Sequence, residues 1–138
     1  MATYIMAPKA PWQSLYVTHP HIFIQMKNFR RNSAFEILVL DDKRVRRRFC
    51  FATWFKAGTA GGSRQLPFYC EVPLRLEYGW NEVHVDCLEL LQNTYKSTFV
   101  ELVRIKFYAN CRVRQVRLWQ FIKLLIKNLG QLISQSSR

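Results

Sequence analysis

The sequence predicts a mainly β protein, an antiparallel sandwich with one short helix and a second, amphipathic helix at its C-terminus. Three observations support this. The chain has 138 residues, enough for one domain with a single core. Aromatic residues make up 14% of it, a composition that suits the packed faces of sheets. Short apolar runs alternate with polar turns at the spacing typical of a sandwich.

The strand pattern recurs along most of the chain. It predicts strands over residues 2–6, 22–28, 34–40, 44–51, 65–76, 81–85, 100–108 and 111–118. Pro67 and Pro73 interrupt the segment 65–76, which is therefore predicted as an edge strand. Two hairpins are expected. One joins 34–40 to 44–51 across a turn at 41–43, and the other joins 100–108 to 111–118.

Helical signals are confined to two places. Asp86 is predicted to cap one or two helical turns that end near Gln92. From Leu118 onward, apolar residues recur at helical spacing with lysines between them, and Gly130 interrupts the pattern. We therefore expect a β-sandwich domain over residues 1–118 and an amphipathic helix and tail over 119–138. This helix can pack on an open end of the sandwich, or bind a partner or a membrane surface.

The charge of the chain indicates a polyanionic partner. Twenty-one Lys and Arg residues against nine Asp and Glu give a formal net charge of +12. Such an excess favours binding to polyanions, and nucleic acid, an anionic membrane and the acidic surface of tubulin all qualify.

Many of the cations are predicted to lie on the outer faces of strands. Residues two apart on a strand share a face and lie about 7 Å apart. This spacing occurs in Arg44, Arg46 and Arg48, and again in two later pairs. The opposite parity is mostly apolar, although Arg47 breaks the pattern and is expected near a sheet edge. The candidate contact residues of this basic face are Lys43, Arg44, Arg46, Arg48, Arg104, Lys106, Arg112 and Arg114.

No pattern in the sequence indicates catalysis, a cofactor or a metal. The sequence contains no phosphate-binding glycine loop, no HExxH motif and no nucleophile elbow. Asp41 and Asp42 are interpreted as turn residues and His84 as a surface histidine. Cys50, Cys70, Cys87 and Cys111 form no CxxC pair and are expected to be buried free thiols in a reducing intracellular compartment. The chain also lacks an apolar run long enough to span a bilayer.

Three stretches resemble the cilia- and flagella-associated inner-junction protein family of axonemal doublet microtubules. They are FEILVLDDKRVRRRF at 35–49, PLRLEYGWNEVHV at 73–85 and VELVRIKFYANCRVRQV at 100–116. The opening Thr3-Tyr4-Ile5, followed by Pro8, is also similar to this family. The resemblance covers residues 2–118 in the same order.

The resemblance implies a jelly-roll type of sandwich and a structural role without catalysis. Family members bridge tubulin protofilaments at the inner junction of doublets, beside other inner-junction proteins, in the cytoskeleton of cilia and flagella and at basal bodies or centrioles. The eight candidate residues would then contact tubulin. This chain departs from the family in lacking its early strands, in Gln92 and Asn93 where an Arg pair is usual, and in its basic C-terminal segment.

Two other functions remain open on the sequence. A nucleic-acid-binding β domain would also use basic strands, and exposed aromatic rings interleaved with the arginines would favour it. Phe49 and Phe51, the rings nearest those arginines, are predicted to face the other way. A carbohydrate-binding module is suggested only by analogy with other jelly rolls.

Overall fold

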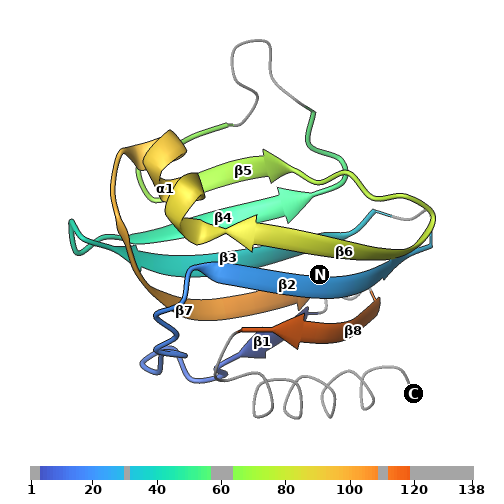
Figure 1. Ribbon diagram of the computed structural model, residues 1–138, viewed down its shortest axis with the longest axis horizontal. Coiled ribbons are helices and arrows are strands. Elements are labelled where there is room, and N and C mark those ends of the chain that lie inside the picture. The colour runs from blue at the N-terminus through green and yellow to red at the C-terminus, as the bar shows by residue number, and fades with distance from the viewer. Residues whose placement is uncertain (1–3, 30–31, 57–63, 109–111, 119–138) are drawn as a thin grey trace.

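The structure is a computed structural model that describes residues 4–29, 32–56, 64–108 and 112–118. Among these residues, two sheets pack across one core to form the predicted β-sandwich, and one short helix lies at one end of it (Figure 1). The fold class is therefore confirmed. The predicted C-terminal helix, the glycine-rich loop and Cys111 lie outside the described residues.

The larger sheet has five strands in the order β1-β7-β3-β4-β5. Its strands are β1 (Tyr4–Ala7), β3 (Ala34–Asp41), β4 (Arg46–Ala52), β5 (Tyr69–Pro73) and β7 (Phe99–Tyr108). All neighbours pair antiparallel except β4 and β5, which are parallel. The hairpin of β3 with β4 and the edge position of β5 agree with the sequence predictions.

The smaller sheet has three strands in the order β6-β2-β8, all antiparallel. They are β2 (His21–Asn28), β6 (Gly79–Asp86) and β8 (Arg112–Arg117). The predicted hairpin of 100–108 with 111–118 is wrong, because β7 belongs to the five-stranded sheet and β8 to the three-stranded one. This crossing between sheets decides where the basic residues lie.

The core is formed by the apolar residues that alternate along each strand and face the opposite sheet. On β2, Ile22, Ile24 and Met26 are buried, and the residues between them face outward. On β8, Val113 and Val116 both face the core although they are three residues apart. A register shift between Gln25 and Met26 on β2 accounts for this, since the bulge adds one residue to β8 and resets its alternation.

The helix α1 (Cys87–Tyr95) follows β6 directly. The Asp86 carboxylate accepts hydrogen bonds from the backbone N–H groups of Leu88 and Glu89, which confirms the predicted N-cap. Cys87 and Leu91 bury its inner side against the core. The helix ends at Tyr95, and the C-cap residue Lys96 adopts a left-handed conformation. In the described part of the chain no helix is long and apolar enough to cross a membrane.

Candidate binding faces

The structure divides the predicted basic face between two sides of the sandwich. Arg46 and Arg48 of β4 lie on the outer face of the five-stranded sheet, as do Arg104 and Lys106 of β7; we call this the five-strand face. Arg112 and Arg114 of β8 lie on the outer face of the three-stranded sheet, the three-strand face. Because the two sheets share one core, these faces point in opposite directions.

The turn after β3 removes Arg44 from the predicted row of strand arginines. The Asp41 carboxylate accepts hydrogen bonds from the backbone N–H groups of Lys43 and Val45. This closes a turn in which Arg44 is left-handed, with φ of 59°. The strand β4 therefore begins only at Arg46. Lys43 and Arg44 are both exposed, and the Lys43 ammonium donates a hydrogen bond to the carbonyl of Tyr95.

The sequence pattern predicts Arg47 near a sheet edge. In the structure it is buried instead, on the core side of the inner strand β4. Its Nε lies 2.9 Å from Asp41 Oδ2, and its guanidinium lies 4.3 Å from the centre of the Tyr95 ring. It also donates to the carbonyl of Pro67. Burial opposes ionisation of Asp41, but the hydrogen bonds from Arg47 and the Val45 backbone outweigh it and lower the pKa of Asp41. The ion pair fastens the β3–β4 turn to the core.

The five-strand face combines cations with tyrosine rings. The Arg48 guanidinium lies 4.6 Å from the centre of the Tyr69 ring. The Lys106 ammonium lies between two rings, 4.1 Å from that of Tyr4 and 4.9 Å from that of Tyr108. Such contacts fix the positions of the cations while leaving the exposed Arg48 accessible.

Carboxylates also lie on this face, which is therefore less uniformly basic than the three basic strands alone predicted. Glu36 pairs in register with Lys106 on one side and Cys50 on the other. Its carboxylate accepts a hydrogen bond from Tyr108, and Glu71 accepts one from Tyr69. The sequence prediction missed these acids because they stand on β3 and β5, which carry no basic row.

Cys50 lies among these acids and is protonated at neutral pH. Burial, together with the nearby Glu36 carboxylate, raises the pKa of its thiol to about 11. Burial likewise raises the pKa of the Tyr69 and Tyr108 phenols. Cys50, Cys70 and Cys87 are free and buried, as predicted. None of these groups is poised to act as a nucleophile.

Arg104 is committed to internal packing more than the prediction assumed. It is half-buried, and its Nη2 donates a hydrogen bond to the carbonyl of Ala10 at 3.0 Å. Its Nε is buried and has no hydrogen-bond partner among the described residues. Arg104 therefore ties the segment after β1 to β7, and the accessible cations of this face are Arg46, Arg48 and part of Lys106.

The three-strand face holds functional candidates that the sequence reasoning missed. Lys27 of β2 lies between Arg112 and Trp80 in the register of the sheet. Its ammonium is 5.8 Å from the centre of the Trp80 ring, and the Arg114 guanidinium is 5.9 Å from the same point. Apolar residues of 22–28 occur at both odd and even positions, so the sequence does not indicate which side of β2 faces outward. Trp80 stands at an even position, whereas Val83 and Val85 stand at odd ones. This pattern could have indicated that Trp80 faces away from the core.

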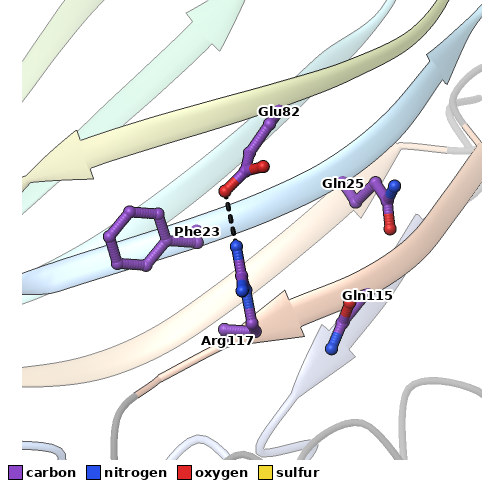
Figure 2. A pocket seen from close by; sticks show the side chains of 5 residues that line it. All are labelled: Phe23, Gln25, Glu82, Gln115 and Arg117. Atoms are coloured by element: carbon purple, nitrogen blue, oxygen red, sulfur yellow. Dashed lines mark hydrogen bonds and ion pairs between the residues drawn. The ribbon is translucent and has the colours of Figure 1, made fainter.

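A polar hollow of about 190 Å³ lies next to this cluster. Figure 2 shows the five side chains that line it. They are Phe23, Gln25, Glu82, Gln115 and Arg117. Arg117 forms an ion pair with Glu82 across the sheet. The hollow therefore offers two uncharged amides between an ion pair and the cations around Trp80.

Histidines close the other end of the three-strand face. His84 is exposed, as predicted, and one of its ring nitrogens lies 2.9 Å from a ring nitrogen of His21. Its ring also stacks on Phe23 with centroids 4.5 Å apart. Within the described ranges no group of three or more His, Cys, Asp and Glu residues is arranged to hold a metal ion.

The sequence of this two-sheet protein also matches a known domain family. Residues 1–123 match the CFA20 domain, so the chain belongs to the CFA20 domain family. This confirms the family resemblance seen in the sequence.

Individual relatives carry a more specific name. The chain is 34% identical over 114 residues to cilia- and flagella-associated protein 20 of Chlamydomonas reinhardtii, a match that covers 83% of this chain and 57% of the relative. The protein of the same name from Paramecium tetraurelia is 34% identical, covering 82% and 56%. That of Caenorhabditis elegans is 32% identical over 143 residues, covering 96% and 68%. The chain thus spans little more than half the length of the first two relatives.

Proposed function

We propose that the protein is a non-enzymatic structural component of ciliary and flagellar axonemes that binds tubulin in doublet microtubules. The observation that carries the proposal is the family match combined with accessible cations on both outer faces of the sandwich. Its relatives are named for their association with cilia and flagella. Tubulin presents an acidic surface, which complements a chain of net charge +12.

The division of the cations suggests how one small domain bridges two protofilaments at the inner junction. Arg46 and Arg48 on the five-strand face would contact one acidic surface, with Lys43, Arg44, Arg104 and Lys106 around them. Arg112 and Arg114 on the three-strand face would contact another. Two opposed faces support a bridging role better than the single continuous face that the sequence predicted. Neighbouring inner-junction proteins would complete the assembly.

This proposal places the protein in the cytoskeleton of cilia or flagella, along the axoneme and at basal bodies or centrioles. It needs no cofactor and no small-molecule substrate.

A nucleic-acid-binding role is the second candidate, because aromatic rings do lie beside the cations. Phe49 and Phe51 are buried, as predicted, but Tyr69 lies against Arg48, Tyr4 against Lys106 and Trp80 near Arg114. Rings and cations together are typical of surfaces that bind single strands. The test must therefore compare the two polyanions directly.

The experiment is co-sedimentation with microtubules near physiological salt, with single-stranded RNA as competitor. Replacing Arg46 and Arg48 with Glu should weaken microtubule binding about tenfold or more. The control replaces Lys56 and Arg75, exposed cations in the loops after β4 and β5, and has the same change of charge. An equal loss of microtubule binding in both variants would show that only the net charge matters. Release of the wild-type protein from microtubules by RNA would favour the nucleic-acid-binding role.

A further inference from the structure

Three cations on the three-strand face are left without an acidic partner. Lys27 and Arg114 lie 5.8 and 5.9 Å from the centre of the Trp80 ring, and Arg112 lies opposite Lys27 in the register of the sheet; none of the three forms an ion pair with a described carboxylate. Arg112 and Arg114 are exposed, and the Trp80 side chain is 44% exposed. Closely spaced like charges repel each other, so an anionic ligand would stabilise this arrangement.

The adjoining hollow is suited to a polypeptide main chain. Gln25 and Gln115 lie opposite each other in the register of β2 and β8 and both line the hollow (Figure 2). A glutamine amide offers both a donor and an acceptor, the pair of groups that a peptide unit requires. Arg117 and Glu82 bound the hollow at its far side.

The Phe23 ring of this face is already in contact with side chains of the protein, and cations lie near the Trp80 ring, which disfavours base stacking. The Phe23 ring is stacked on His84 at an interplanar angle of 5°, and the Arg117 guanidinium lies 5.3 Å from its centre. Trp80 has cations near it at 5.8 and 5.9 Å. A nucleic acid would have to displace these contacts to stack its bases.

We propose that the three-strand face binds an extended, glutamate-rich peptide, with its carboxylates on Lys27, Arg112 and Arg114 and its main chain over Gln25 and Gln115. Lys27 and Phe23 are four residues apart on β2, so the stretch of the face between them is about 13 Å long and accommodates about four residues of extended chain. The peptide class rests on the proposed function, since the acidic tails of tubulin subunits are peptides of this kind.

The first test uses a fluorescent poly-glutamate peptide and full-length variants of the chain. Replacing Arg112 and Arg114 with Glu should weaken peptide binding about tenfold. Replacing Lys56 and Arg75, the exposed cations in the loops after β4 and β5, with Glu changes the net charge equally and should leave peptide affinity within about twofold. Equal losses in the two variants would overturn the proposal. So would tighter binding of a single-stranded RNA that is lost only in the Arg112/Arg114 variant.

The second test uses microtubules whose acidic tails have been removed by limited proteolysis. Tail removal should weaken binding of the wild-type chain and have no further effect on the Arg112/Arg114 variant. If tail removal weakens both proteins equally, the three-strand face is not the peptide site. If the wild-type chain binds neither intact nor trimmed microtubules, the proposed function fails, and the peptide titration still decides the inference.

Discussion

At the scale of single residues, the buried pair of Asp41 and Arg47 governs the β3–β4 turn. Replacing Asp41 with Ala leaves the Arg47 guanidinium buried without its carboxylate and removes the acceptor of two turn N–H groups. We expect a loss of about 3–5 kcal/mol in the free energy of unfolding, measured in urea. The double variant that also replaces Arg47 with Met should recover part of this loss. A double variant less stable than the single one would show that the ion pair is not the cause.

The same pair predicts acid sensitivity. The pKa of Asp41 is lower in the folded protein than its ordinary value of 3.8, so protonation favours the unfolded chain. The stabilisation is complete above the unfolded pKa and disappears as the pH falls through the folded pKa. Urea titrations between about pH 5 and pH 2 should show a decrease that is smaller in the Asp41→Asn variant. Identical slopes would contradict the assignment.

Residue patterns predicted the turn role of Asp41 but not the direction of Arg47. Acidic residues between two strands indicate a turn whatever the rest of the fold does. A charged residue among core-facing positions is normally expected to turn toward solvent, and the burial of Arg47 beside Asp41 becomes favourable because the distant Tyr95 and Pro67 also contact it. Such partners come from elements that local sequence does not bring together.

At the scale of elements, α1 depends on its N-cap. Asp86→Ala leaves the N–H groups of Leu88 and Glu89 without their acceptor and should cost about 1 kcal/mol in urea unfolding. Asp86→Ser restores an acceptor and should retain most of the stability. If Ser and Ala destabilise equally, the side-chain cap does not stabilise the helix.

The periodicity of the sequence predicted which segments form strands, but it did not predict which strands pair with each other. Outward-facing basic residues and buried apolar residues recur along β7 and β8, with a bulge interrupting the alternation in each, and this pattern does not indicate which sheet the strand joins. Adjacent strands usually form hairpins, so the sequence favoured pairing β7 with β8. The structure pairs β7 with β1 and β3 instead, and β8 with β2. This long-range choice separated Arg112 and Arg114 from the other candidate residues.

At the scale of the whole molecule, two opposed basic faces predict bridging. The wild-type chain should bundle microtubules at low salt, and rising salt should reverse this as exposed charges are screened. Variants with Glu at Arg46 and Arg48, or at Arg112 and Arg114, should bind single microtubules and fail to bundle them in light-scattering assays. Bundling by both variants at wild-type levels would contradict a bridge made by these faces.

The most direct test of the central claim is electron cryo-microscopy of doublet microtubules from cells with and without the protein. We expect a two-sheet density at the inner junction that disappears in its absence, with the five-strand and three-strand faces turned toward different tubulin surfaces. Doublets that are identical in the two samples, or a density that contacts no tubulin, would rule out a tubulin-binding role at the inner junction.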